Sequence, residues 1–509
     1  MLKKILIRSI VTLLLVSIIF SLAACSEPGA STTTTSSTST EKPYDNYPTQ
    51  LIGLNDQYDD TTVEIIYVEG AAGTYTADSI CVDPEAGALD DVKMGVIERN
   101  NQIQEDLGVT IEPVTDQTLG IDSLYSYAKV FFDTQDPSLD VYAGYQYFDI
   151  GVATSGHLMN LKSIVNDKGE TIIDTSREYW ASNYIDSITY NDNMFWVTGD
   201  LALRYIGGLY CTFVNLELYD LYVRSNYENK SIYEIVDSGN WTMKTMLDMA
   251  NMVYDDSDNS GTASELDRLG IVFETCDVMD GYSFGCDVSY SKKATIGGKD
   301  SITIEINKDS KASDLAAFLD TMVNSNYAYN AGNDSSKLMM PIYAAGDTLF
   351  CLNQISMAEV YLSEMSYYGI IPPPKLNTSQ TNYTTGVHDS VTLFGISKWS
   401  DCPELSAATL ELMAYYGKTL VADVYYEKVL KGSRVSQDDE SSAMIEKIRD
   451  GFDTDFAAAW SHSIGNIVHI YRTPSNLKQF STFIKISSRE WPGQLTELTA
   501  QLEQAVLEE

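Results

Sequence analysis

The segment Asp256–Gly261 (DSDNSG) has oxygen-bearing side chains at alternate positions and is a candidate metal-binding loop. Counted from Asp256, oxygen donors stand at positions 1, 3 and 5 (Asp256, Asp258 and Ser260), glycine at position 6 and Asp267 at position 12. This is the spacing of an EF-hand-type calcium loop. Position 12 is Asp instead of the usual Glu, and a metal-free turn rich in Asp, Asn and Gly has the same composition. The sequence leaves both a structural calcium ion and a metal-free turn open.

A second candidate site is a run of aromatic and amide side chains after a short apolar segment. Residues 139–143 predict a buried strand, and Tyr145, Gln146 and Tyr147 follow it. In open α/β sheets, ligands bind beyond the carboxyl ends of the strands. Tyrosine rings there can stack on the C–H faces of a sugar, and an amide can hydrogen-bond its hydroxyls. Packing of these rings in the core is the other interpretation.

Signatures of common enzymes are absent from the sequence. It contains no G-x-S-x-G elbow, no H-E-x-x-H pair and no phosphate-binding P-loop, and its four histidines do not stand at metal-ligand spacing. A glycosidase needs only two carboxylates about 5 to 9.5 Å apart, and among 72 acidic residues such a pair carries no information. We therefore expect a protein that is not an enzyme, without catalytic residues and without a cofactor other than the possible calcium.

Length and charge limit the class of protein further. The 509 residues are 44% apolar and 21% charged, which is typical of a globular protein of two or three domains. The net charge of −39 excludes a basic nucleic-acid footprint and disfavours electrostatic docking onto anionic lipid.

The amino terminus predicts export and lipid anchoring. Three basic residues precede an apolar stretch that ends in Leu-Ala-Ala-Cys, so residues 1–24 resemble a bacterial lipoprotein signal peptide, with Cys25 as the lipidated residue. An ordinary signal peptide or an anchor helix is the alternative. Residues 25–60 include ten consecutive Ser or Thr residues at 31–40 and predict a tether. We expect the protein at the outer face of the cell membrane.

The six other cysteines form no C-x-x-C pair, which disfavours a zinc site. Cys276 and Cys286 are close enough in sequence to form a disulfide in an oxidising compartment, and buried free thiols are the equal alternative.

The pattern of the body is α/β. Residues 62–68 and 109–111 read as strands, and the helix expected between them, at 90–107, ends at Gly108, which indicates a parallel unit. Further strands are expected at 196–197, 209–214, 302–306, 349–352, 369–371 and 391–396, and further helices at 242–253, 313–322, 403–416 and 492–506.

The order of short signatures resembles the extracellular solute-binding proteins of bacterial ABC importers, in the sugar-binding group that includes maltose-binding protein. The resemblance covers residues 60–500. It rests on LDVY at 139–142, GHLMNL at 156–161, LYCTFVN at 209–215, GNWT at 239–242, the acidic loop at 256–261, YAAGDTLF at 343–350, YGIIPPP at 368–374 and FGIS at 394–397.

The resemblance implies a two-lobed type II periplasmic-binding-protein-like fold with the ligand in a cleft between the lobes. It maps the first lobe to 61–205 plus 385–435 and the second to 210–380 plus 440–509, with a first crossing near 204–210. It places a first-lobe contact at Tyr145 with Gln146, next to Tyr147 of the same aromatic run, and a second-lobe contact at Asn353 or Gln354. The family often has Trp in that second loop, whereas this chain has Ile355-Ser356 there. Asp389 and Trp460 complete the predicted site.

These observations predict a lipid-anchored binding protein that captures a solute, expected to be a sugar or oligosaccharide. Hinge closure would then present the solute to the membrane permease of an ABC importer. The alternatives are a surface-anchored glycoside hydrolase and an adhesin lipoprotein.

Overall fold

The computed structural model describes residues 46–54, 61–68, 79–85, 89–115, 119–334, 336–365, 367–432 and 439–507. The predicted signal peptide, Cys25 and the Ser/Thr run lie outside the described residues. Within the described ranges, no helix combines the length and the apolar character that crossing a membrane requires.

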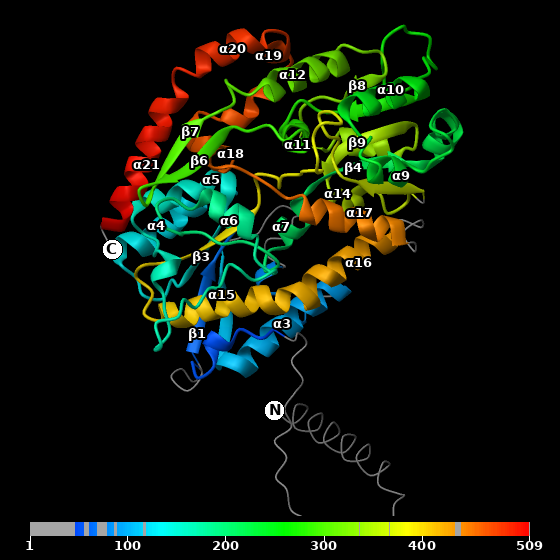
Figure 1. The fold of residues 1–509 in the computed structure, drawn as a ribbon. Coiled ribbons are helices and arrows are strands. Elements are labelled where there is room, and N and C mark those ends of the chain that lie inside the picture. The colour runs from blue at the N-terminus through cyan, green and yellow to red at the C-terminus, as the bar shows by residue number, and fades with distance from the viewer. Residues whose placement is uncertain are drawn as a thin grey trace, which may run out of the picture. The chain divides into compact units, whose positions relative to one another are not determined.

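The first sheet has four strands in the order β11-β3-β1-β2. Strand β1 (Thr61–Ile66) runs parallel to β2 (Val109–Val114) and β3 (Val141–Tyr145), whereas β11 (Thr392–Ile396) is antiparallel to β3. Helices α3 (Asp91–Leu107) and α15 (Pro403–Gly417) cover it (Figure 1). The predicted strand–helix–strand unit is confirmed: Asp90 caps α3 by accepting from the Lys93 N–H, and Gly108 ends it at φ 70°.

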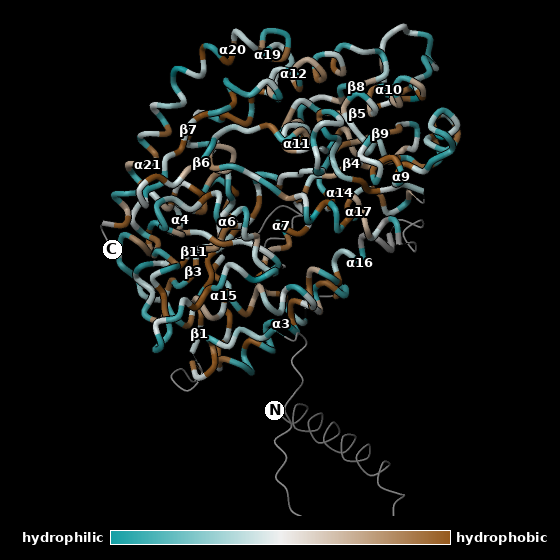
Figure 2. The backbone as a smooth tube through the Cα atoms, viewed as in Figure 1, coloured by the Kyte–Doolittle hydropathy of each residue, from teal (hydrophilic) through white to brown (hydrophobic). Residues whose placement is uncertain are grey.

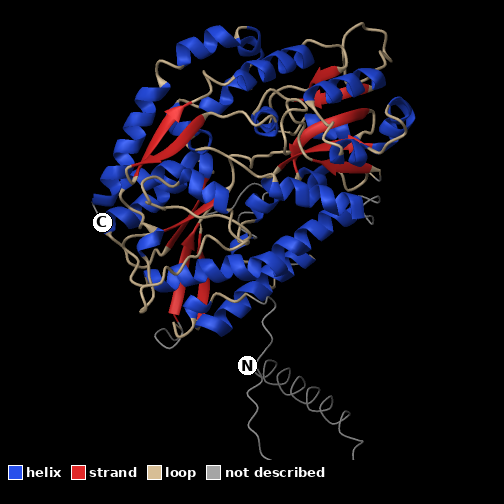
Figure 3. Cartoon of the chain, in the orientation of Figure 1, coloured by secondary structure: helices blue, strands red, loops and turns tan. Residues whose placement is uncertain are grey.

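The second sheet has five strands in the order β10-β4-β9-β5-β8. Strand β4 (Tyr210–Asn215) is antiparallel to β9 (Thr348–Gln354) and β10 (Tyr368–Ile371), whereas β5 (Leu269–Phe273) is parallel to β9 and β8 (Ala328–Asn330). These two sheets lie apart along the molecule, each with helices outside it, and the β6–β7 hairpin forms a separate pair of strands (Figure 3). The strand segments are mostly apolar, as buried sheets require (Figure 2).

The remaining helices follow the chain around these sheets. Thr242 caps α10 through its side chain, as predicted, and α10 packs on β5. Besides α3 and α15, the α-helices of the described residues up to residue 450 include α4 (Leu124–Thr134), α5 (Gln146–Asp149), α6 (Ser182–Ile188), α7 (Leu203–Gly208), α8 (Leu216–Leu218), α9 (Ile232–Asp237), α10 (Met243–Val253), α11 (Asp280–Gly285), α12 (Ser310–Val323), α13 (Met339–Ala344), α14 (Met357–Tyr361), α16 (Asp423–Gly432) and α17 (Asp439–Asp450).

Three chain segments meet where the two sheet regions are joined. Leu209, between α7 and β4, pairs with Val387 in an antiparallel bridge, and Thr385 pairs with Phe452 in a parallel bridge. The Thr385 N–H donates to the Gly451 carbonyl, and the Asp453 N–H donates back to Thr385. These short pairings connect segments that are far apart in sequence, as expected of a hinge between two lobes.

The hairpin of β6 (Ser291–Ile296) and β7 (Lys299–Ile304) forms a second connection, to residues 186–191. The Asn191 N–H donates to an Asp300 carboxylate oxygen (2.8 Å), and the Asp300 N–H donates to the Asn191 amide oxygen (2.6 Å). Lys293 Nζ donates to the carbonyls of Asp186 and Thr189 at the end of α6, at 2.8 and 2.7 Å. The hairpin thus connects a second-sheet segment to a first-sheet segment.

The carboxyl-terminal region passes between both parts of the body. It contains α18 (Phe456–Ala459), η8 (Ser461–Ile464), η9 (Ile467–Tyr471), α19 (Pro474–Lys478), α20 (Phe480–Ser487) and α21 (Trp491–Leu507). Helices α19 and α20 contact α12, whereas α21 contacts the short helix η2 (Ile150–Ser155) and the β7 strand. The segment predicted to belong to the second lobe therefore has contacts on both sides.

Residues 46–54, predicted as part of the tether, lie against the body. The short helix η1 (Thr49–Leu51) buries Leu51, Leu54 is also buried, and the Tyr47 ring meets the Tyr415 ring edge-on at 5.5 Å. The apolar side chains of this segment explain the difference, because burying them stabilises the packed position.

The six cysteines after Cys25 are free thiols, and all but the half-buried Cys81 are buried. The structure therefore favours buried free thiols over a Cys276–Cys286 bridge.

Candidate ligand-binding cavity

A small cavity lies where the end of β3, helix α11, the crossing segment and the region after α18 converge. Its free volume is about 20 Å³, room for about one water molecule. The walls come from both sheet regions and are formed by Gln146, Tyr147, Asp280, Phe284, Val387, Asp389, Ala458, Ala459, Ser461, His462, Val468, His469 and Arg472.

A tight turn at the carboxyl end of β3 directs Gln146 and Tyr147 into this cavity. The buried Asp149 carboxylate accepts the Tyr145 N–H at 2.8 Å and the Tyr142 hydroxyl at 2.7 Å. Burial raises the pKa of Asp149 to about 6, although these hydrogen bonds oppose the shift. Residue 144 must be glycine, because a Cβ atom there would lie 2.6 Å from the Asp149 Cβ.

Gln146 connects three parts of the chain. Its side-chain N–H donates to the Ala459 carbonyl at 3.1 Å, its oxygen accepts the Tyr184 hydroxyl at 2.6 Å, and its backbone N–H donates to Val391. Because both ends of the buried amide are bonded, Gln146 positions the wall of the cavity.

Tyr147 has two imidazole rings parallel to its own. The His462 ring lies 4.6 Å away at an interplanar angle of 5°, and the His469 ring 5.6 Å away at 16°. The Tyr147 backbone carbonyl accepts a hydrogen bond from His462 Nδ1 at 2.8 Å, and the Tyr147 hydroxyl contacts the Asn466 side chain at 3.3 Å. Burial and the nearby Arg472 guanidinium lower the pKa of His469 to about 4, so its ring is neutral near pH 7.

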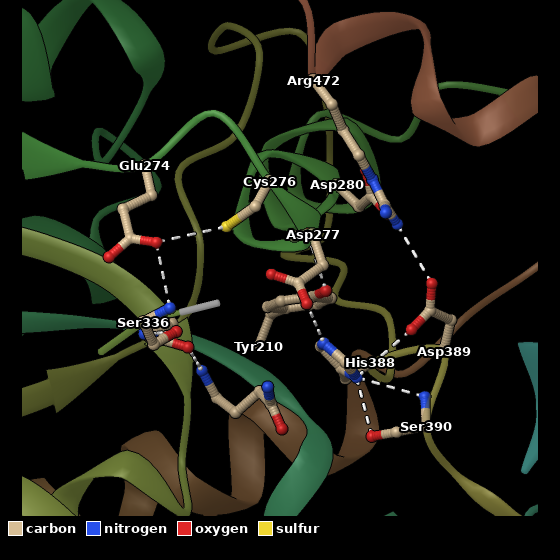
Figure 4. A network of polar contacts seen from close by, with 12 residues as sticks. Tyr210, Glu274, Cys276, Asp277, Asp280, Ser336, His388, Asp389, Ser390 and Arg472 are labelled. Atoms are coloured by element: carbon tan, nitrogen blue, oxygen red, sulfur yellow. Dashed lines mark hydrogen bonds and ion pairs between the residues drawn. The ribbon is translucent and has the colours of Figure 1, made fainter. Parts of the chain in front are cut away.

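Arg472 bridges two carboxylates of the cavity wall (Figure 4). Its Nε and Nη2 donate to the two oxygens of Asp280 at 3.0 and 2.5 Å, and Nη2 also donates to Asp389 at 3.0 Å. Asp280 begins α11, Asp389 follows the crossing segment and Arg472 follows η9. One guanidinium therefore holds three separate segments together through charge-assisted hydrogen bonds.

A second ion pair lies beside the first. His388 Nε2 bonds an Asp277 carboxylate oxygen at 2.8 Å, and His388 Nδ1 lies 2.7 Å from the Ser390 hydroxyl (Figure 4). Burial opposes charge on both groups, but their attraction outweighs it. As a result, the pKa of Asp277 is lowered and the pKa of His388 is raised. The pair ties the crossing segment to the start of η6 (Asp277–Met279).

The cavity offers stacking faces and oxygen acceptors. Both oxygens of Asp280 are held by Arg472, and the same guanidinium bonds Asp389, so each of these charges has a partner. Such a wall suits a neutral, hydroxyl-bearing ligand better than an anion, because the Arg472 cation is already shared by two carboxylates.

The structure brings three of the predicted ligand-binding residues to this cavity: Gln146, Tyr147 and Asp389. Tyr145 is buried beneath the Arg204 guanidinium, 4.5 Å from its ring centre. Trp460 is buried in the core, where its indole N–H donates to the Ile188 carbonyl at 3.3 Å.

The predicted second-lobe contacts lie elsewhere. Asn353 is fully buried in β9 and donates to the Ser336 hydroxyl at 2.9 Å, and Gln354 ends the same strand. Neither is among the described residues that line the cavity.

Sequence reasoning missed the most strongly charged wall residues, Asp280 and Arg472, and two of the histidines. A usable signal was present, since the chain has only four histidines and three of them, His388, His462 and His469, gather at or beside this cavity. No sequence spacing relates them, because they come from the crossing segment, η8 and η9.

A more open cavity of about 450 Å³ lies beside the crossing segments. Its walls include Trp180, Tyr205 and Phe452, and the buried Asp200 carboxylate, whose nearest cation is Arg449 at 3.5 Å. It contains none of the predicted site residues.

The acidic loop folds into a compact turn. Ligand oxygens of Asp256, Asp258 and Asp267 lie within 4.8 Å of one another. The backbone N–H groups of Ser257, Ser260, Gly261 and Ser264 donate to the Asp256 and Asp267 carboxylates, whereas the Ser260 hydroxyl donates to the Thr262 carbonyl at 2.8 Å. Three of the four predicted metal ligands therefore converge, and Ser260 faces the loop backbone.

Comparison with known proteins adds the fold. The sequence matches no family model and no curated protein. Among solved structures, the chain is similar to an ABC substrate-binding protein from Listeria monocytogenes in complex with cycloalternan, with a TM-score of 0.50 and 13% identity, over 84% of this chain and 99% of that one. It is also similar to a cyclo/maltodextrin-binding protein complexed with maltotetraose, with a TM-score of 0.52 and 9% identity, over 88% and 98% of the two chains.

The chain has the fold of the ABC substrate-binding proteins. The predicted two-lobed type II α/β fold is thereby confirmed, with one lobe built on each sheet. The boundaries predicted for the lobes stay predictions, although every strand of the two main sheets falls within the lobe to which the sequence assigned it.

Proposed function

We propose that the protein is a lipid-anchored extracellular solute-binding protein that captures a neutral sugar or oligosaccharide and delivers it to an ABC importer. The observation that carries this proposal is a single cavity whose stacking and acceptor groups come from both lobes. Tyr147 lies in the part of the chain predicted as the first lobe, Asp280 in the part predicted as the second, and Asp389 directly after the crossing segment that joins them. A ligand that touches all three stabilises one relative position of the lobes.

The ligand class rests on the cavity and agrees with the relatives of similar fold. Cycloalternan and maltotetraose are the ligands named for the two solved structures. In this chain, an aromatic ring and paired carboxylates offer the same two kinds of contact that a sugar uses, through its C–H faces and its hydroxyls.

Hinge closure is the mechanism we propose for capture. The free volume of about 20 Å³ is too small for a sugar ring, so a ligand can enter only when the walls separate. Pairings of Leu209 with Val387 and of Thr385 with Phe452 supply the flexible connection about which the lobes would turn.

A surface glycoside hydrolase or an adhesin would share the predicted location. A hydrolase needs a carboxylic acid that protonates the leaving oxygen. Both oxygens of Asp280 accept from Arg472, which favours the ionised form, but burial outweighs this and raises the pKa of Asp280 to about 7, so the group can carry a proton near neutral pH. An adhesin would not need a cavity with walls from both lobes. The shared cavity therefore favours ligand capture over adhesion, and product analysis distinguishes binding from hydrolysis.

A thermal-shift panel of neutral oligosaccharides, including maltotetraose and cycloalternan, tests the proposed function. A sugar at 100 times its Kd should add about 2.7 kcal/mol to the unfolding free energy. Product analysis after long incubation separates binding from hydrolysis. If no member of the panel raises the melting temperature, the carbohydrate assignment is wrong; cleaved sugar would favour the hydrolase.

Anchoring is tested separately in a Gram-positive host. Mass spectrometry of the mature protein should find Cys25 as the first residue with attached acyl chains. A Cys25→Ala variant should leave the membrane fraction, because a lipid anchor needs that thiol. An unmodified mature terminus elsewhere would show an ordinary signal peptide.

A further inference from the structure

The cavity wall contains one group that can move without disturbing the core. Gln146, Asp280 and Ser461 are buried, and Tyr147, Asp389 and Arg472 are partly buried and bonded to neighbouring segments. Among the described wall residues, His462 is the exposed one. Releasing its side chain to solvent leaves no buried polar group unpaired, so the cost in free energy is small.

His462 lies where a stacked ligand ring would lie. Aromatic rings stack with centres about 4.5 to 7 Å apart, and His462 is parallel to Tyr147 at 4.6 Å. The Tyr147 carbonyl is an acceptor beside the same ring, and His462 Nδ1 donates to it at 2.8 Å. A sugar that stacked on Tyr147 through its C–H face could donate a hydroxyl proton to this carbonyl. The imidazole therefore makes the two contacts that a sugar would make.

The backbone next to His462 changes direction sharply. Gly465 (φ 64°) and Asn466 (φ 57°) are both left-handed and separate η8 from η9. Asn466 also contacts the Tyr147 hydroxyl, so the segment 461–466 is attached to Tyr147 mainly through exposed or half-buried groups. Rotation of the His462 side chain away from Tyr147 would uncover the ring while the buried Ser461 and Ile464 keep the backbone in place and Arg472 keeps its ion pairs.

We propose that His462 is a built-in occupant of the ligand position on Tyr147 and that a neutral sugar ring displaces it. This inference rests on the proposed function and deepens it. His462 competes with the ligand for the face of Tyr147 and so weakens binding. A ligand must therefore gain more binding free energy from its contacts in the cavity than His462 loses on leaving the ring.

Sugar titrations of the His462→Ala variant test the competition. The probe is the neutral oligosaccharide of the panel, maltotetraose and cycloalternan included, that gives the largest thermal shift. The apparent Kd equals the intrinsic Kd divided by the fraction of molecules with Tyr147 uncovered, so removing the competitor should tighten binding by about three- to tenfold. His157→Ala is the matched control, because His157 stacks on Phe132 at 4.7 Å away from the cavity, and should leave the Kd unchanged.

Displacement is followed directly by NMR of the histidine ring protons. In the free protein the His462 resonances should be shifted upfield by the Tyr147 ring current, and Tyr147→Leu should abolish that shift. Saturating sugar should move them toward solvent-exposed values in the wild type.

The outcomes separate the two proposals. Weaker or equal sugar binding by His462→Ala, or an unmoved resonance on saturation, overturns the displacement while the binding function stands. A wild type and a His462→Ala variant that both bind no sugar overturn the proposed function and the displacement together.

Discussion

At the scale of single residues, the cavity depends on groups whose partners are fixed by the fold. Gln146 and Tyr147 were predicted from their place after a strand, and the structure places both in the wall. Trp460 was predicted from its residue type and its polar neighbours Ser461 and His462. Residue type does not determine whether a side chain at the end of a short helix faces the core or a cleft. Trp460 directly follows α18, and its ring packs inward, stacked on Phe456 with ring centres 5.7 Å apart. Position after a strand predicted the wall residues Gln146 and Tyr147, but it did not separate them from Tyr145, which is buried beneath Arg204.

Tyr147 substitutions test the stacking surface. Tyr147→Ala removes the ring and should weaken sugar binding by about ten- to a hundredfold, since such contacts contribute about 1 to 3 kcal/mol. Tyr147→Phe keeps the ring and loses the contact with Asn466, so its Kd should stay within about threefold of the wild type. Calorimetric titration measures both. Equal loss in the two variants would show that the hydroxyl, not the face, carries the contact.

Glu411 should impose a pH dependence on stability. Its buried carboxylate accepts from the Tyr179 hydroxyl (2.6 Å) and the Trp180 indole N–H (3.0 Å), with no cation among these partners. Burial raises its pKa from 4.5 to about 7 despite these hydrogen bonds. The folded state therefore holds a proton that the unfolded state has lost, and the stabilisation is complete below pH 4.5 and disappears as the pH rises through 7.

Urea unfolding across this pH range checks the Glu411 prediction. Between pH 4.5 and 7, the wild type should lose up to about 1.4 kcal/mol per pH unit relative to Glu411→Gln, which cannot titrate. Asp149 and other buried acids remain in both proteins, so the difference between the two slopes isolates Glu411. Parallel slopes would show that Glu411 titrates normally in the folded state.

At the scale of elements, hydrophobic pattern and caps predicted most of both sheets. The strand at 109–111 and the helix ended by Gly108 are present as β2 and α3. The predicted strand at 196–197 is only a bridge between Val197 and Phe394. The β6 strand (SKKATI) was missed because its residues are mostly polar and exposed, which gives no apolar alternation to detect. Packing onto α6 and α18, far away in sequence, supports it instead.

The acidic loop gives a prediction at this scale. If the loop binds calcium, the ion would offset the electrostatic repulsion among the carboxylates of Asp256, Asp258 and Asp267. Calcium at 100 times its Kd should raise the unfolding free energy of chelator-treated protein by about 2.7 kcal/mol. Asp258→Asn should abolish this gain, whereas Asp255→Asn, outside the predicted ligand set, should keep it. If calorimetric titration of the chelator-treated protein with millimolar calcium shows no heat of binding, the metal-free turn is favoured.

At the scale of the whole molecule, the two lobes are connected on two sides. The crossing segments around Val387 form one connection, and the β6–β7 hairpin forms another through Asn191, Asp300 and Lys293, beside the carboxyl-terminal helix α21, which contacts η2 and β7. A hinge alone allows opening, but the hairpin contacts must break before the lobes can separate. The sequence predicted a first crossing near 204–210, where α7 leads into β4, but it could not predict a contact between a polar hairpin and a loop 109 residues away.

Loss of the hairpin contact should therefore favour the open form of the free protein. The double variant Lys293→Ala, Asp300→Ala removes three of the hydrogen bonds described between the hairpin and residues 186–191, including two to carbonyls at the end of α6. Hydrogen bonds with charged groups contribute about 1.5 to 3 kcal/mol each when buried and less where they are exposed. A total change near 1.4 kcal/mol would shift the equilibrium about tenfold.

Small-angle X-ray scattering of the unliganded mature protein measures this shift. The double variant should have a larger radius of gyration than the wild type, and saturating sugar should return it toward the wild-type value by adding contacts to both lobes. Lys299→Ala, at the tip of the same hairpin, removes a cation for which the structure gives no contact with residues 186–191 and should not alter the radius. Equal radii for wild type and double variant would show that the crossing segments and the carboxyl-terminal region hold the lobes together without these hairpin hydrogen bonds.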